Sequence, residues 1–241
     1  MSDDEYEYDY GSDQDEGSEG GDDGNGVADE LIEIENAFYE GDDLKHDQPK
    51  KAIELFEKVV ELEAKRGDVV KWRFKALQHL VTIHFILGNY QQMVERYRGM
   101  LVYMASVTRN ECTDAINAIL DTLTAATDAS VLSEMYEITL LALKGSNNER
   151  LWFNTNHKLA KLYLDGNKIQ EVERLIVVLK QSCQRPDGSD DTSKGTYLLE
   201  VYCLEIQVCS KTRNSARMRQ IYPRTMNLNA AGEPTHPTNI L

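Results

Sequence analysis

The stretch GNYQQMVERY, from Gly88 to Tyr97, returns as GNKIQEVERL at Gly166 to Leu175, with Gly-Asn, Gln, Val, Glu and Arg in register. The spacing of 78 residues corresponds to two units of about 39, which lies in the range of helix-turn-helix repeats. Such units bury their apolar faces only against their neighbours. The repeat therefore predicts an extended solenoid surface that binds other macromolecules, and it argues against a closed catalytic pocket.

Proline content and apolar periodicity both indicate helices. No proline lies between Pro49 and Pro186. Apolar stripes at i, i+3, i+4 and i+7 include the set Ile116, Ile119, Leu120 and Leu123 and the set Val172, Leu175, Ile176 and Leu179. Together with start and stop signals they predict ten helices in five hairpins, near residues 29–40, 49–66, 71–87, 90–106, 111–126, 129–144, 149–164, 168–183, 196–210 and 213–222.

Charge is unevenly distributed along the chain. Residues 1–44 hold 18 of the 41 acidic residues and none of the 26 basic ones, so the rest of the chain is near neutrality at about +3. The fold class predicted is all-α, a tetratricopeptide-like solenoid over residues 29–222. A disordered acidic tail is expected at 1–28 and an irregular tail at 223–241, where the helical pattern ceases.

Several classes of function lack support in the sequence. No signal peptide and no run of 18 apolar residues is present, so we expect a soluble intracellular protein with neither a membrane nor a nucleic acid as a partner. The four cysteines are scattered, and His79 and His84 are five residues apart, off the spacing that places two ligands on one helix face. Without a nucleophile or metal motif, we expect no enzyme, no metal and no intrinsic cofactor.

The candidate binding site with the highest density of basic residues is the stretch AKRGDVVKWRFKAL at residues 64–77. Five basic residues lie within eleven positions: Lys65, Arg66, Lys71, Arg73 and Lys75. Such a run is commonly a solvated helix face. The alternative is an anion-binding corner at a helix entrance, suited to acidic proteins or phosphate groups, with Trp72 at its centre.

Several blocks of the chain resemble the second-subunit family of the COP-nine signalosome, in its N-terminal half. They are IENAFYEGDDLKHDQPKKAIELFEKVVELE (34–63), FKAL (74–77), SVTRN (106–110), NNERLWFNTNHKLAKLYL (147–164) and KGTYLLEVYCLEIQ (194–207). The resemblance implies a non-catalytic helical-repeat arm within a complex that removes Nedd8 from cullins. Its implied partners are the other signalosome subunits and the cullin C-terminal region with its RING protein, in cytoplasm and nucleus.

The resemblance also implies a ligand, inositol hexakisphosphate, held by basic residues between arm and cullin. By motif this role falls on Lys75, which follows Phe74 in FKAL, and on Arg66 ahead of Gly67, with Lys71 and Arg73 beside them. Two departures from the family pattern are visible. About three extra residues lie between Gly67 and Phe74, and the chain ends four residues after Pro237, where the family continues into a PCI domain.

A second function stays open on the sequence alone. A free-standing helical-repeat adaptor, not assembled in the complex, would clasp peptide tails with Lys, Arg and Asn side chains that converge inside its groove.

Overall fold

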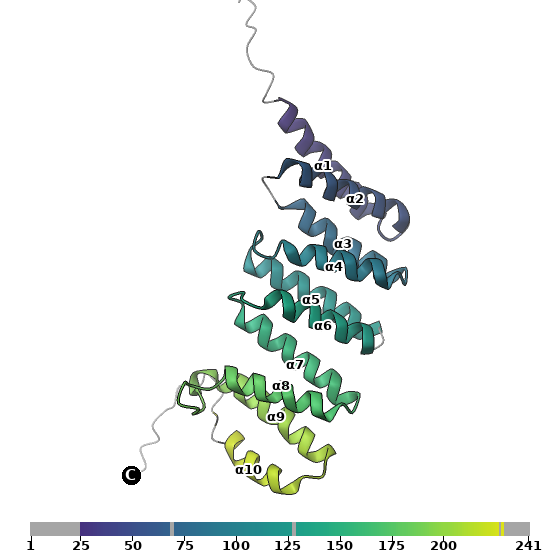
Figure 1. The fold of residues 1–241 in the computed structure, drawn as a ribbon. Coiled ribbons are helices and arrows are strands. Elements are labelled where there is room, and N and C mark those ends of the chain that lie inside the picture. The colour runs from purple at the N-terminus through teal and green to yellow at the C-terminus, as the bar shows by residue number, and fades with distance from the viewer. Residues whose placement is uncertain (1–24, 68–69, 127–128, 227, 229–241) are drawn as a thin grey trace, which may run out of the picture.

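A computed structural model describes residues 25–67, 70–126, 129–226 and 228 of the chain, and these residues form an elongated stack of helices (Figure 1). The predicted helices are all present. In chain order they are α1 (Asn25–Leu44), α2 (Pro49–Arg66), α3 (Trp72–Ile86), α4 (Tyr90–Val102), α5 (Arg109–Ala126), α6 (Ala129–Leu143), α7 (Glu149–Asp165), α8 (Ile169–Ser182), α9 (Gly195–Lys211) and α10 (Ser215–Met226). The all-α class predicted from the sequence is confirmed.

The ends of the array differ from the predicted boundaries. Of the predicted acidic tail, residues 1–24 lie outside the described residues, and α1 begins at Asn25, four residues before the predicted start. The helix then runs past Gly41, where a turn was expected. A Cβ at Gly41 would lie 3.1 Å from the Phe56 ring, so this glycine serves close packing of α1 on α2 and does not end the helix.

Helical structure also extends past residue 223, where the irregular C-terminal tail was predicted to begin. Helix α10 passes through Pro223 and ends at Met226, while residue 227 and residues 229–241 lie outside the described part. The polar loop predicted at residues 185–195 contains a short 3₁₀-helix, η1 (Thr192–Lys194), that the sequence did not indicate. Asp191 caps η1 by accepting a hydrogen bond from the Ser193 amide.

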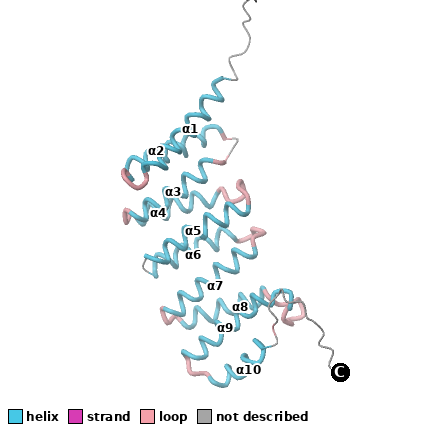
Figure 2. The backbone as a smooth tube through the Cα atoms, turned by 180° about the vertical axis from the view of Figure 1, so that it is seen from behind, coloured by secondary structure: helices cyan, strands magenta, loops and turns pink. Residues whose placement is uncertain are grey.

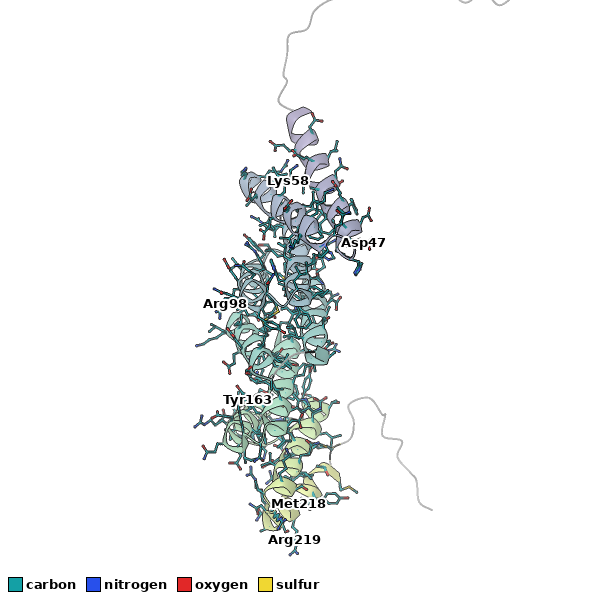
Figure 3. All side chains as sticks on the ribbon, turned by 90° about the vertical axis from the view of Figure 1, so that its right-hand side faces the viewer. Asp47, Lys58, Arg98, Tyr163, Met218 and Arg219 are labelled. Atoms are coloured by element: carbon teal, nitrogen blue, oxygen red, sulfur yellow. The ribbon has the colours of Figure 1, made fainter. Side chains whose placement is uncertain are left out.

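The helices follow one another down the stack, as the view from behind also shows (Figure 2), and they form two layers that lie side by side in the view turned by 90° (Figure 3). Odd-numbered helices stack on one another in one layer, where α3 contacts α1 and α5, and α7 contacts α9. Even-numbered helices form the second layer, and Lys58 of α2 and Arg98 of α4 project from the same side of the stack (Figure 3). We call the outer surface of α3, α5, α7 and α9 the odd-helix face.

An apolar core runs between the two layers. The stripe from Ile116 to Leu123 is buried as predicted, and the stripe around Val172 is buried except for the partly exposed Leu175. One group of buried residues spans α1 to α7, and a second spans α7 to α10. Trp152 of α7 packs against both groups. Every helix pair is therefore stabilised by burial against its neighbours.

The repeat that indicated the fold is a repeated turn. After α3, the Gly88 amide donates to the Phe85 carbonyl and the Asn89 amide to the His84 carbonyl, which is a Schellman motif. The same pair of bonds follows α7, from Asn167 and Lys168, and α9, from Arg213 and Asn214. Each motif ends an odd-numbered helix and directs the chain into the second layer.

The structure shifts the repeat by one residue from the sequence alignment. The left-handed residue of the turn is Gly88 (φ +73°) in one copy and Asn167 (φ +57°) in the other, so Gly166 is not the equivalent of Gly88. In the same register the fully buried Met93 corresponds to Val172. The identical residues of the two segments are 78 positions apart, whereas structurally equivalent residues of the two turns are 79 positions apart.

The third of these turns places an arginine in a conformation that favours glycine. Arg213 has φ +55° and an exposed side chain, so Arg213→Gly should raise the free energy of unfolding by about 0.5 to 1 kcal/mol. Urea denaturation followed by circular dichroism measures the change. Arg219→Gly, an exposed position inside α10, is the control and should lower stability by about 1 kcal/mol. Destabilisation by both variants would contradict the strain assigned to Arg213.

Candidate functional site

The basic stretch surrounds the start of α3, where the backbone amides already have an acceptor. Glu63 of α2 is buried, and its carboxylate accepts hydrogen bonds from the amides of Lys71 (3.2 Å), Trp72 (3.0 Å) and Arg73 (2.6 Å). Gly67, in the left-handed conformation, ends α2 and lets the chain turn back. The anion at this helix entrance is thus a side chain of the protein itself, because Glu63 satisfies the donors that a bound phosphate would use.

Arg73 has a structural position. Its side chain is buried, its Nε lies 4.0 Å from Glu63 Oε2, and its guanidinium lies 4.3 Å from the centre of the Tyr103 ring. The charge of Arg73 is thus directed into the corner between α2, α3 and the end of α4, and its contact with a phosphate ligand stays a prediction that this inward position does not favour. A cation is needed there to accompany the buried carboxylate.

Arg66 also faces the protein. Its side chain is 13% exposed and its Nη1 lies 3.6 Å from Glu30 of α1, across the end of α2. The Asp68 and Val69 positions, which carry part of the predicted insertion, lie outside the described residues. Arg66 is therefore an element of the contact between α1 and α2.

Lys71 and Lys75 form the outward part of the basic stretch, which we call the lysine pair. Their Nζ atoms lie 4.4 Å and 5.5 Å from the centre of the Trp72 ring, which is buried against Phe38. Both lysines line a hollow of about 500 Å³ between α3 and α5. Their position at the first turn of α3 lets them present two positive charges to a ligand from outside.

The opposite wall of this hollow carries acidic residues. Glu111 and Asp114 of α5 line it together with Thr108. Hydrogen bonds from the Thr108 hydroxyl and amide hold the pKa of the exposed Glu111 carboxyl below its usual value. Carboxylates and lysines therefore share one hollow, and a ligand that is only anionic fits the α3 side better than the α5 side.

Two further hollows follow along the odd-helix face. One, of about 620 Å³, lies between α5 and α7 and is lined by Arg109, Arg150 and several asparagines. The other, of about 400 Å³, lies between α7 and α9 and is lined by Trp152, Phe153 and Tyr197. Neither was predicted. The asparagines could have been found from the sequence, because Asn110 and Asn147, like Asn117 and Asn154, recur 37 residues apart.

The two histidines of α3 occupy packed positions. His84 is buried, and burial lowers its pKa, as it does for His79, whose ring stacks on Phe56 at 5.0 Å between centroids. Among the described residues no group of three His, Cys, Asp or Glu side chains is placed to hold a metal ion. Within the same residues, no helix combines the length and apolar character that a bilayer crossing requires.

The fold defines the class of the molecule, an all-α protein of tetratricopeptide-like helix hairpins whose odd-numbered helices carry a row of hollows. The COP9 signalosome complex subunit 2 of Drosophila melanogaster is 40% identical to it over 232 residues, which are 96% of this chain and 51% of that protein. The subunit 2 of Caenorhabditis elegans is 41% identical, over 91% of this chain and 43% of that protein. The resemblance found in the sequence is confirmed: the chain is homologous to COP9 signalosome complex subunit 2.

The chain spans about half the length of the curated relatives it matches. No protein-family model matches it. Among solved structures, the TPR-like repeats of a kinesin light chain from Podosopora anserina match with a TM-score of 0.38 and 18% identity, covering 80% of this chain and 96% of that one. The fold class rests on the packed helices of the chain itself.

The buried carboxylate at the start of α3 can be tested by stability. Glu63→Ala should lower the free energy of unfolding by about 3 kcal/mol, since it leaves three amides without an acceptor and Arg73 without its counter-charge. Glu61→Ala, at an exposed position on the same helix, is the matched control and should change stability by less than about 0.5 kcal/mol. Equal denaturation midpoints for the two variants would show that Glu63 does not hold this corner.

Proposed function

We propose that this chain is the helical-repeat arm of a COP9 signalosome subunit, a non-catalytic scaffold that binds cullin-RING ubiquitin ligases for the removal of Nedd8. The observation that carries the proposal is the homology, 40–41% identity to subunit 2 of an insect, a fungus and a nematode over at least 91% of the chain. The other subunits of the complex are its proposed partners. The catalytic step would belong to one of those partners.

The geometry supports a binding role. An elongated two-layer stack exposes a large surface relative to its volume, and its hollows are open and lie side by side along one face. Large partners such as a cullin C-terminal region and its RING protein suit such a surface better than a small substrate does. This proposal differs from the free-standing adaptor in requiring a folded partner and an assembled complex.

We further propose that inositol hexakisphosphate bridges the arm and the cullin at the lysine pair. A polyphosphate neutralises several basic groups at once, and Lys71 and Lys75 are the residues of the predicted set that face outward. A basic surface on the cullin would supply the other half of the ligand shell. Arg66 and Arg73 then support the site only by holding the helices that present the lysines.

Calorimetric titration of the full 241-residue chain with a cullin C-terminal region and its RING partner tests the function. We expect binding that becomes tighter when inositol hexakisphosphate is present. Absence of binding in both conditions would contradict the arm as a self-sufficient recruitment module, and the free-standing adaptor would then be the better explanation.

The lysine pair is tested by one charge reversal. In the presence of inositol hexakisphosphate, Lys75→Glu should weaken cullin binding about tenfold and remove the effect of the ligand, because a carboxylate would then face the phosphates. Lys50→Glu makes the same change of charge at an exposed position on α2 and should leave the ligand effect intact. A ligand effect that survives Lys75→Glu unchanged would exclude this site.

A further inference from the structure

We propose that the odd-helix face across α5, α7 and α9 binds an extended, acidic peptide segment of a partner that carries one large apolar side chain. The asparagines between α5 and α7 would hold the peptide main chain, and the aromatic hollow between α7 and α9 would hold the apolar side chain. This inference goes beyond the proposed cullin site and involves neither Lys71 nor Lys75.

The polar hollow is built by two helices in a matched register. Asn110 and Asn117 lie seven residues apart on α5 and share one helix face, while Asn154 lies on α7 and Asn147 directly precedes Asn148, the N-cap of α7. Members of the two pairs are 37 residues apart in sequence. The salt bridge from Lys158 to Asp121 has the same offset and a length of 2.6 Å, which shows that equivalent positions of α5 and α7 face one another.

Two of these amides are open to a ligand. Asn117 and Asn154 are half-buried and make no hydrogen bond to any residue in the described part of the chain, whereas Asn148 caps α7 and donates to Thr113. A carboxamide offers a donor and an acceptor together, the same pair that a peptide group presents in an extended strand. Half-buried side-chain amides whose hydrogen-bonding groups are unused therefore suit recognition of a peptide main chain, independent of the peptide's sequence.

Charge around the hollow selects for acidic residues. Arg109 and Arg150 line it, are exposed, and form no ion pair within the described residues; the same holds for Lys144 in the next hollow. Of the acidic groups at the two hollows, Glu149 is paired with Lys194 at 3.6 Å. Asp114 alone among the described lining residues opposes the three basic side chains, so carboxylates of a bound peptide would be attracted.

The neighbouring hollow provides an apolar anchor site. Trp152 and Tyr197 are partly exposed on its walls, and the rings of Phe153 and Tyr197 lie 4.3 Å apart. A volume of about 400 Å³ accommodates a Phe or Leu side chain, and aromatic walls give the contact area on which short segments depend. Glu149 lines both hollows, so one ligand can occupy them together.

The spacing of the hollows defines the peptide. Adjacent packed helices lie about 8–10 Å apart, and an extended chain advances about 3.3 Å per residue. About three residues therefore separate the acidic part of the segment from its apolar anchor. A peptide with acidic residues three and four positions from a Phe or Leu would therefore place its carboxylates at the hollow between α5 and α7 and its apolar side chain in the hollow between α7 and α9.

The test uses the full 241-residue chain and fluorescein-labelled ten-residue peptides with acidic residues three and four positions from one Phe. Fluorescence anisotropy should give a dissociation constant of about 10–100 µM, typical of a small interface. Replacement of the Phe by Ser, or N-methylation of the peptide amides between the acidic residues and the Phe, should each weaken binding at least about fivefold, since they remove the anchor or the main-chain donors.

Matched protein variants test whether the asparagines bind the peptide. The double variant Asn117→Ala/Asn154→Ala should weaken peptide binding about tenfold, and Gln91→Ala/Gln92→Ala, which removes two exposed amides from α4, should not. Circular dichroism checks that both double variants keep the helix content. Equal affinities for the two double variants, or no binding of the Phe peptide by the unaltered chain, would overturn the proposal.

The outcome is independent of the proposed cullin function. Peptide binding should be unchanged by inositol hexakisphosphate and by Lys75→Glu, which act at the hollow between α3 and α5. Displacement of the peptide by inositol hexakisphosphate would show that the acidic residues bind at the lysine pair, and that would contradict a peptide site across α5, α7 and α9. Loss of cullin binding alone, with the peptide still bound, would count against the proposed function only.

Discussion

The buried carboxylate of Glu63 organises the first corner of the array. By accepting three successive amides at the start of α3 it supplies the negative charge that a helix N-terminus favours, and it does so from the neighbouring helix. A buried carboxylate needs a cation nearby, so Arg73 faces inward against it and stacks on Tyr103. Only then do Lys71 and Lys75 face outward over Trp72.

Local turns and burial between neighbouring helices also determine the arrangement of the rest of the stack. Schellman turns after α3, α7 and α9 end the odd-numbered helices at equivalent points, so successive hairpins enter the array in the same way. Burial between neighbours then aligns α5 with α7, and the Lys158–Asp121 pair lies within that alignment. The hollows of the odd-helix face are a product of this stacking, because each is walled by residues from two successive odd-numbered helices.

Most of the helices could be predicted because their information is local. The apolar period, Pro49 at the first turn of α2 and Gly88 after α3 act within a few residues, so boundaries such as Pro49–Arg66 were correct. The boundaries that failed depend on distant contacts. Gly41 remains helical because Phe56 requires the space, and the turn after α7 has its left-handed residue at Asn167, one position from the aligned glycine.

The candidate site, like the helix boundaries, was determined in part by local sequence and in part by contacts between distant residues. The sequence by itself determined that the chain is a helical repeat, that it resembles the signalosome second subunits, and that basic residues gather near the start of α3. Which of those charges face outward was decided by tertiary structure, because Glu63 and Glu30 lie on other helices and contact Arg73 and Arg66. The meeting of Asn117 with Asn154 was decided there too, since residues 37 positions apart share a hollow only once α5 and α7 have packed side by side.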